Sequence, residues 1–297
     1  MTELEDYQWE LGGVVFGIDC PIDHEADVAP GEISWRTQDN SSPVGDALMM
    51  GRDKIDPGVW SFKLFTNCDS PGEALAALEE LATVWTGDDV RDDPGAVMAL
   101  RYRLNGRTRI VYGRPRRFSA PLGAEFLSGR VMITCDFQTV SPLYFDDFES
   151  SMPQVRQLAA VAGGFEAPFE SPLSTLQIAG STPYAFSVGG VKPTPMMIDF
   201  TGPSSDAVLD IDGKIQVRLS GDVAGDQAGR VTVDARPWVM SAYRRDGAEV
   251  AGLLSPRTRL PRLLLAPGPH VATYSASGDD TGVSYATMRW RSAYPSI

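Results

Sequence analysis

Apolar and polar residues alternate along several stretches of the first half of the chain. Between residues 59 and 65, Trp60, Phe62 and Leu64 share one side of an extended backbone, and polar residues lie between them. This two-residue period is that of a half-buried strand. Residues 126–140 alternate in the same way. Both stretches are therefore predicted to be strands of a sheet.

One stretch has the period of a helix. Ser70 is a typical N-cap residue, Pro71 suits the first helical position, and Glu73 completes a capping box. Gly87 supplies a C-terminal stop. No other stretch indicates a helix as clearly. The predicted apolar stripe of this helix consists of Leu75, Leu78, Leu81, Ala82 and Trp85.

Residues 98–112 form the clearest predicted hairpin. Asn105-Gly106 is the favoured two-residue turn between antiparallel strands. Apolar side chains alternate with arginines on both sides of the turn, so the sequence predicts one apolar face and one arginine-rich face. The arginine face would consist of Arg101, Arg103, Arg107 and Arg109.

The composition changes near the middle of the chain, where Pro, Gly, Ser and Ala replace the regular alternation. We therefore predict an N-terminal α+β domain with one clear helix over residues 1–150, a linker over 151–175 and a β-sandwich over 176–297. Short strands separated by turn residues fill the last part, and Asp212-Gly213 marks a hairpin turn. The predicted fold class is mainly β, with a jelly-roll or related sandwich.

Charge and cysteine content exclude several functions. The net charge of −13 makes general binding to nucleic-acid phosphates unfavourable. Cys20, Cys68 and Cys135 stand far apart and form no CxxC pair, which fits a reducing cytoplasm and gives no redox or metal motif. The chain begins without a signal-peptide pattern and has no apolar run of transmembrane length. We expect a soluble protein made in the cytoplasm, without membrane insertion.

Candidate catalytic groups are few. The two histidines, His24 and His270, have no cysteine or histidine partner at metal-ligand spacing. Nucleotide-binding, serine-hydrolase and zinc-protease motifs are absent. Adjacent aspartates stand near Gly or Pro, where Asp is a common turn residue. These pairs are Asp88-Asp89, Asp92-Asp93, Asp146-Asp147 and Asp279-Asp280. We predict no enzymatic activity, no cofactor and no metal site.

Two features are candidates for binding. Arginine forms planar bidentate pairs with carboxylates and is favoured at interfaces. We therefore expect the four arginines of the hairpin to contact an acidic surface of a neighbouring subunit. A solvated strand face is the alternative, and nucleic-acid binding comes third because no aromatic residues interleave with the arginines. Trp238, which follows a predicted strand, is a candidate for stacking on a sugar.

Several stretches of the first half occur in a characteristic order. Gly51-Arg52-Asp53 precedes the strand Trp60–Phe65, and the capped helix and the hairpin Leu100–Tyr112 follow. The strand Val131–Val140 then runs into Ser141-Pro142-Leu143-Tyr144-Phe145. Together these stretches resemble the belt domain of the distal tail proteins of long-tailed phages (siphoviruses), especially the minor tail proteins of phages that infect actinobacteria. Ser141 stands where that family's pattern has an aspartate.

The second half resembles the galectin-like sandwich of the same family. The stretches that carry this resemblance are Gly189–Pro195, Arg230–Arg236, Leu265–His270 and Thr287–Tyr294. The resemblance implies a structural protein of the virion that forms a six-fold ring at the far end of the tail tube. Its partners would be other copies of itself, the tail tube protein and the tail tip proteins, and the genome would pass through the ring without specific nucleic-acid binding.

Two other functions remain open. The first is a carbohydrate-binding adhesion module for the host cell wall, which would need Trp238 exposed in a groove. The second is a cell-wall-degrading hydrolase, which would need two carboxylates facing each other across a cleft.

Overall fold

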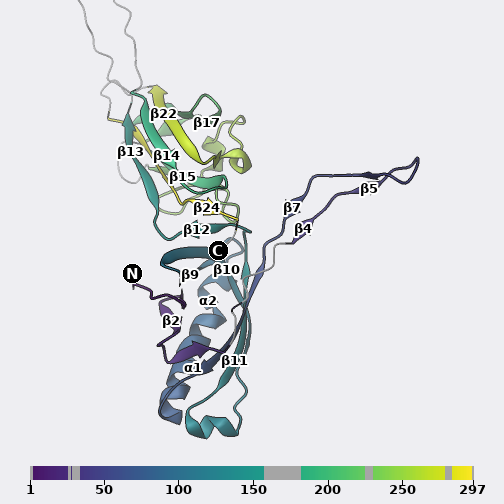
Figure 1. Cartoon of the computed structure of the whole chain (residues 1–297). Helices are drawn as coiled ribbons and strands as arrows, with labels where there is room; N and C mark the ends of the chain where they lie inside the picture. The colour runs from purple at the N-terminus through teal and green to yellow at the C-terminus, as the bar shows by residue number, and fades with distance from the viewer. Residues whose placement is uncertain are drawn as a thin grey trace, which may run out of the picture. The chain divides into compact units, whose positions relative to one another are not determined.

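The computed structural model describes residues 3–25, 28, 34–156, 182–224, 230–277 and 283–295 (Figure 1). The chain divides into two compact units. The N-terminal unit comprises residues 1–147 together with 294–297, and the C-terminal unit comprises residues 148–293. The prediction of a mainly β fold with one clear helix is confirmed.

The N-terminal unit is built on one antiparallel sheet. Its main strands follow the order β2-β1-β9-β10-β11-β8-β3, and β12 pairs with β10. The chain returns to this sheet near its C-terminus through β24 (Ala293–Tyr294), which pairs with β12. The other strands are β1 (Gln8–Leu11), β2 (Val14–Gly17), β3 (Ile22–His24), β8 (Val59–Thr66), β9 (Met98–Leu104), β10 (Arg107–Ser119), β11 (Met132–Thr139) and β12 (Tyr144–Asp146).

Aromatic side chains on one side of this sheet form the core of the N-terminal unit. Trp60, Phe62 and Leu64 of β8 are at most 1% exposed, as their alternation predicts. The ring of Trp60 lies 4.9 Å from that of Tyr102 in β9, measured between centroids. Phe137 of β11 is also completely buried. The core thus joins strands that are far apart in the sequence.

The strand predicted over residues 126–140 is shorter than expected. Its first residues belong to a 3-10 turn, η1 (Ala124–Ser128), and β11 begins only at Met132. Gly129 ends the turn with a φ of +76°, a value that favours glycine. A Cβ atom at this position would lie 2.4 Å from the carbonyl oxygen of Cys68, so the backbone passes too close for a side chain.

The predicted helix is present as α1 (Pro71–Thr86). The Ser70 hydroxyl accepts a 3.3 Å hydrogen bond from the Glu73 backbone N–H, and Gly87 ends the helix in the left-handed conformation. A short helix, α2 (Asp88–Arg91), follows. Leu75 does not join the buried stripe and is 39% exposed, because Ala74 occupies that face instead. The buried residues of α1 are Ala74, Leu78, Leu81 and Trp85.

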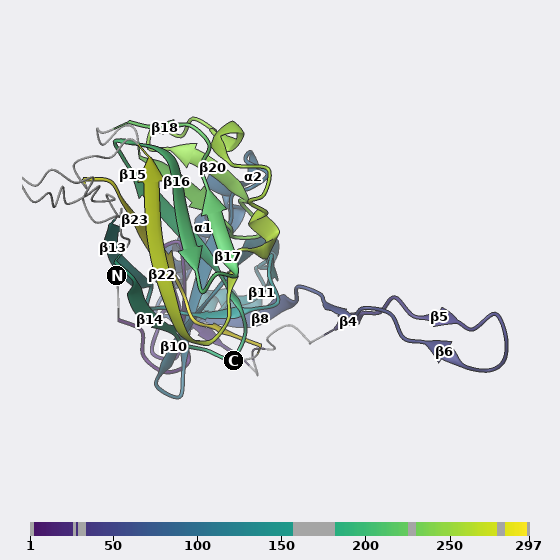
Figure 2. The same ribbon diagram turned by 90° about the horizontal axis from the view of Figure 1, so that it is seen from above.

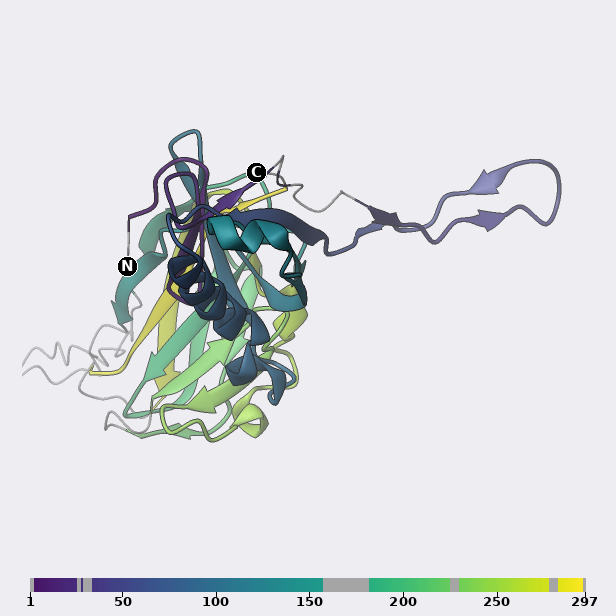
Figure 3. The ribbon, with the colours of Figure 1, turned by 90° about the horizontal axis from the view of Figure 1, so that it is seen from below.

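Residues 34–58 form a two-stranded arm that leaves the sheet before β8 (Figure 3). Trp35–Arg36 (β4) pairs with Lys54–Ile55 (β7), and Asn40–Ser41 (β5) pairs with Leu48–Met49 (β6). These four short strands form two separate two-stranded sheets. Most residues of the arm are exposed, so the arm has no apolar core of its own.

The C-terminal unit is a sandwich of two antiparallel sheets. The larger sheet has the order β13-β23-β15-β19-β20 with β21 paired to β15, and the smaller has the order β14-β22-β16-β17 with β18 paired to β16. Figure 2 shows β22, β16 and β17 side by side. The strands are β13 (Ser150–Arg156), β14 (Tyr184–Val188), β15 (Thr194–Thr201), β16 (Ser204–Ile211), β17 (Ile215–Arg218), β18 (Asp222–Val223), β19 (Val231–Asp234), β20 (Ser241–Arg244), β21 (Leu264–Leu265), β22 (Gly268–Ser277) and β23 (Tyr285–Trp290). Two 3-10 turns, η3 (Ala251–Leu253) and η4 (Leu260–Arg262), connect some of them.

Alternate side chains of both sheets fill the core of the sandwich. Ile198 and Phe200 of β15 are completely buried, and Trp290 of β23 is 4% exposed. The hairpin predicted at Asp212-Gly213 is confirmed, because Ile211 of β16 pairs with Ile215 of β17.

The segment predicted as a linker begins with a strand. Residues 151–156 belong to β13, which pairs with β23 at one edge of the larger sheet. Met152 and Val155 are each 2% exposed, so their burial in the sandwich core holds the strand in place. The remainder of the predicted linker, residues 157–175, lies outside the described residues.

Candidate assembly surfaces

The β9–β10 hairpin does not present a single arginine face. Its two-residue turn pairs Tyr102 directly with Arg109. Directly opposed residues lie on the same side of a sheet. Arg107 and Arg109 therefore share the side of the buried Tyr102, whereas Arg101 and Arg103 lie on the other side. The prediction of one arginine-rich face is wrong, because it took the alternation of each strand separately and omitted the pairing across the turn.

Arg101 is held inside the N-terminal unit by two carboxylates. Its guanidinium donates to both oxygens of Asp147, at 2.9 Å from Nε and 2.7 Å from Nη2, and also contacts Glu10. The Arg101 side chain is only 10% exposed. The Asp147 hydrogen bonds raise the pKa of Arg101 against the opposing effect of its burial. Arg101 is thus part of a buried charge cluster.

Arg109 is also buried by residues of its own chain. Its guanidinium forms an ion pair with Asp146, the residue opposite it in the ladder of β10 and β12. The guanidinium carbon lies 3.6 Å from the centre of the Tyr294 ring, a cation–π contact. The hydroxyl of Tyr294 donates to Asp146 at 3.2 Å. These contacts fix Tyr294 on the N-terminal unit.

Arg103 and Arg107 lie nearer to solvent. Arg103 donates to the Leu4 carbonyl at 3.1 Å, and its Nε lies 3.6 Å from a carboxylate oxygen of Asp6. Asp6 also accepts a 2.7 Å hydrogen bond from the backbone N–H of Gly106 in the turn. Arg107 is exposed and has no ion pair within the described part of the chain. Contact of these arginines with a neighbouring subunit stays a prediction, and Arg107 is the residue best placed for it.

A pocket of about 440 Å³ opens beside this turn. Its lining residues are Tyr7, Leu104, Asn105, Arg107 and Arg109. It contains two cationic side chains and no acidic one. The Arg109 Nε atom is buried without a hydrogen-bond partner. A buried donor of this kind is costly to leave unsatisfied.

The arm carries several strongly exposed apolar side chains. Val44 is 85% exposed, Met50 78% and Trp35 56%. An isolated two-stranded ribbon is only marginally stable in water. Contiguous apolar surface on a monomer commonly marks a site of protein contact. The sequence did not predict this arm, because an exposed ribbon lacks the alternation of apolar and polar residues that marks a half-buried strand.

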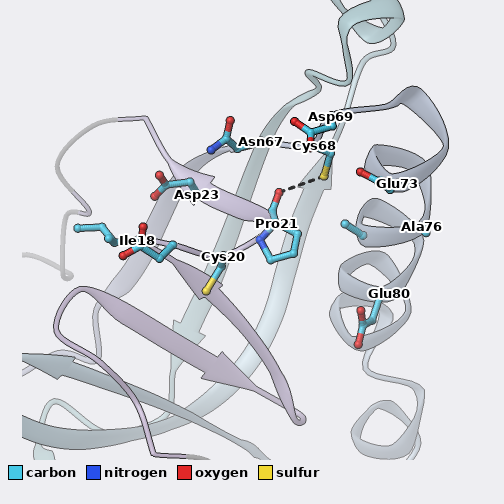
Figure 4. Close-up of a pocket in the computed structure, with 12 residues that line it drawn as sticks. Ile18, Cys20, Pro21, Asp23, Asn67, Cys68, Asp69, Glu73, Ala76 and Glu80 are labelled. Carbon is cyan, nitrogen blue, oxygen red and sulfur yellow. Dashed lines mark hydrogen bonds between the residues drawn. The ribbon is translucent and has the colours of Figure 1, made fainter.

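One pocket of the N-terminal unit is acidic. It measures about 730 Å³ and lies between the β2–β3 loop, the segment before α1 and α1 itself (Figure 4). Its carboxylates come from Asp19, Asp23, Asp69, Glu73 and Glu80. Cys20 and Cys68 also line it, and the Cys68 thiol donates to the Pro21 carbonyl at 3.6 Å. Among the described residues, no group of three His, Cys, Asp or Glu side chains is arranged to hold a metal ion.

Both thiols of this pocket are poor nucleophiles. Burial raises the pKa of Cys20, and the charges of Asp23 and Asp19 raise it further. Burial and then the charge of Glu73 raise the pKa of Cys68. A raised pKa keeps a thiol protonated at neutral pH, and the thiolate is the reactive form.

The two histidines have separate structural roles. His24 lies in β3, where its ring stands 5.5 Å from that of Trp9 and its Nδ1 lies 3.0 Å from Asp23. His270 bonds the Asp212 carboxylate through Nδ1 at 2.6 Å and the Ala266 carbonyl through Nε2 at 2.7 Å. Both acceptors require a donor, so the imidazolium form fits this site best.

Trp238 lies beside an arginine of its own unit. Its ring is half-buried, and the guanidinium of Arg236 lies 5.7 Å from the ring centre. Arg236 in turn donates to the buried carboxylate of Asp234, at 2.6 Å from Nη2. A sugar would have to compete with these contacts, and stacking by Trp238 stays a prediction.

Sequence reasoning missed the partners of the buried arginines. Asp146-Asp147 was interpreted as a turn pair, but the two carboxylates bind Arg109 and Arg101. Their separation of 37 and 46 residues along the chain hides this pairing from any local pattern. Asp279-Asp280 lies outside the described residues. None of the described helices has the length and apolarity of a membrane span.

The fold is similar to that of two phage proteins of known structure. The Dit protein of phage SPP1, described as a paradigm of the hub adsorption apparatus in phages that infect Gram-positive hosts, matches with a TM-score of 0.55 at 10% identity, over 96% of this chain and 98% of its own. A chain of the phage P2 baseplate, in its activated conformation with Ca, matches with a TM-score of 0.53 at 9% identity, over 98% and 99%. No family model and no curated protein sequence matches. The likeness therefore shows the fold, over nearly the whole chain.

Proposed function

We propose that this chain is the distal tail hub protein of a long-tailed phage. Copies of it would form a six-fold ring at the end of the tail tube and connect the tube to the tail tip proteins. The fold likeness to two phage adsorption proteins over at least 96% of the chain supports this role. The host group, actinobacteria, rests on the sequence resemblance alone.

The observation that carries the proposal is the exposed arm. Its two pairs of short strands are joined by ladder hydrogen bonds and a few exposed polar contacts, and its apolar side chains face solvent. Burial of apolar surface stabilises an association by about 25 cal/mol per Å² before the entropic costs of binding. A second copy of the chain that covers the arm would gain this term. Because the arm and the surface it covers are different parts of the chain, successive copies would make a head-to-tail contact. Such contacts form a ring where the rotation between copies closes.

The acidic surface fits such a ring. A net charge of −13 repels nucleic-acid phosphates, so a genome could pass through the ring without binding to it. The ring would be part of the virion, and no catalytic step is needed for this role.

The experiment compares the full chain with an arm-shortened variant. In the variant, an Asn-Gly turn replaces residues 39–50, which contain β5 and β6. Native mass spectrometry and negative-stain imaging over a range of concentrations should show six-fold rings for the full chain and monomers for the variant. Lys214→Ala, in the exposed turn of the C-terminal unit, is the control and should keep the rings.

Both proteins should unfold at the same temperature, because the arm contributes little to the core. A full chain that stays monomeric at every concentration, and that is missing from the distal end of assembled tails, would overturn the proposal.

A further inference from the structure

The pocket at the turn of the β9–β10 hairpin is built for an anion. Arg107 and Arg109 line it, together with Tyr7, Leu104 and Asn105, and none of these five residues is acidic. In a chain of net charge −13, two arginines without a lining carboxylate are unusual.

Arg109 adds a second observation. Its side chain is 7% exposed, and its Nε is buried without a hydrogen-bond partner. Its Nη1 contacts Asp146, so the buried Nε is a second donor of this guanidinium that has no partner among the described residues. Arginine binds carboxylates through two parallel donors, which makes a carboxylate the best-fitting ligand.

The tip of the arm has the complementary chemistry. No lysine or arginine occurs between Arg36 and Arg52, whereas Asp39 and Asp46 lie in this stretch. Asp39 already accepts a 2.8 Å hydrogen bond from the Gly51 backbone N–H. Asp46 is exposed in the loop between β5 and β6 and has no hydrogen bond or ion pair within the described chain. Asp46 is therefore the acid of the arm tip that is free to bind elsewhere.

We propose that this pocket binds the Asp46 carboxylate of a second copy of the chain. The inference rests on the proposed ring and names the contact that closes it. Arg107 at the rim provides the charge that attracts Asp46, and Arg109 beneath it provides a fixed donor. Val44, two residues before Asp46, then covers the apolar side chains of Leu104 and Tyr7.

The size of the pocket agrees with this assignment. About 440 Å³ is more than one carboxylate requires and leaves room for a turn of a polypeptide. The acidic tip and the basic pocket lie on different elements of the N-terminal unit. Each copy can therefore donate one such contact and accept another, which allows a head-to-tail ring.

A charge-swap series on the full-length chain tests the contact. Asp46→Arg and Arg107→Glu each place like charges at the contact, and each should raise the concentration at which half of the protein is in rings by about tenfold or more. The double variant restores an opposite pair and should recover to within about threefold of the wild type. Ring formation is measured by mass photometry at constant ionic strength.

Two matched controls accompany the series. Asp53→Arg changes another exposed acid of the same arm, and Arg218→Glu changes an exposed arginine of the C-terminal unit. Both should leave the assembly concentration within about threefold of the wild type. Circular dichroism and thermal unfolding of every variant verify that the monomer is folded.

The outcomes separate this inference from the proposed function. If the wild type forms no rings, the proposed function fails and the contact fails with it. If the wild type forms rings and Asp46→Arg forms them equally well, the ring stands and the inference is wrong. The double variant must also form rings at a lower concentration than either single variant. If it does not, the two residues do not face each other and the inference is wrong.

Discussion

The arm and the β9–β10 hairpin are both two-stranded ribbons of the N-terminal unit, but different contacts stabilise them. The hairpin lies between β1 and β11 in the sheet, and Leu100 and Tyr102 are completely buried. The arm has ladder pairs at only two places, and Val44 at its tip is 85% exposed. The strands of the hairpin thus complete their ladder and core contacts within one chain. The arm leaves them open, which is expected of a segment whose stable conformation depends on a second molecule.

The largest expected effect is on the buried charges of the hairpin. Arg101→Ala would leave Glu10 and Asp147 facing each other without their cation. Removing one partner of a buried ion pair costs about 3–5 kcal/mol. Urea unfolding at neutral pH should show a loss of this size in the free energy of unfolding.

Arg107→Ala is the matched control for that experiment. Arg107 lies on the neighbouring strand and is exposed, so its removal should change the free energy of unfolding by less than about 0.5 kcal/mol. Equal losses of unfolding free energy in the two variants would contradict the distinction between the buried Arg101 and the exposed Arg107. A triple variant that combines Arg101→Leu, Asp147→Asn and Glu10→Gln has no unpaired carboxylate. Partial recovery of its free energy of unfolding would identify the unpaired carboxylates as the cause of the loss.

Two glycines, one in the hairpin and one in the arm, allow the two ribbons to be compared by a change that disturbs the backbone. A Cβ at Gly113 of β10 would lie 2.1 Å from the Gln138 carbonyl oxygen, and a Cβ at Gly51 of the arm would lie 2.1 Å from that of Gln38. The clash is equal, but Gly113 is buried in the sheet, whereas the strands of the arm can separate without opening the core.

Gly113→Ala should therefore lower the free energy of unfolding by about 1–3 kcal/mol, whereas Gly51→Ala should leave it within about 0.5 kcal/mol. Gly51→Ala should instead weaken ring assembly, because it distorts the arm. Thermal unfolding and mass photometry of the same samples measure both effects. A large loss of monomer stability in Gly51→Ala would show that the arm is part of the folding unit.

These two ribbons also show what the sequence could predict. Trp60, Phe62 and Leu64 were placed in the core by alternation alone, and Ser70 and Gly87 gave both ends of the helix. Such features depend on residues close together in the chain. The side of the sheet on which each of the four arginines lies could also have been predicted, because a two-residue turn fixes which residues oppose each other.

Other features depend on contacts that no local pattern contains. The pairing of Arg101 with Asp147 joins residues 46 positions apart. The arm has neither regular alternation nor a core, so no local pattern predicted the pairing of its strands. On the helix, Ala74 is buried and Leu75 is exposed, because burial depends on which face of the helix packs against the sheet and not on the size of the side chain.

The smallest expected effect on stability concerns a third hairpin, whose turn is held by a side-chain contact. In the C-terminal unit, Asp212 in the β16–β17 turn binds His270 of β22 at 2.6 Å and accepts a 2.8 Å hydrogen bond from the Val271 N–H. Burial lowers the pKa of His270, but the bonds to Ala266 and Asp212 outweigh it, and the pKa lies above its ordinary value of 6.5. The His270 bond lowers the pKa of Asp212 below 3.8.

The signs of these shifts define a pH window. A raised histidine pKa stabilises the fold below pH 6.5, and this stability is lost as the pH rises through the pKa of the folded state. A lowered aspartate pKa stabilises the fold above pH 3.8, and this is lost only in stronger acid. His270→Gln should therefore cost about 1 kcal/mol near pH 5.5 and less at pH 8.5. Taking the difference between wild type and variant at each pH removes the pH dependence that the two proteins share. A cost that is the same at both pH values would mean that protonation of His270 adds nothing to the stability of the turn, which contradicts the raised pKa.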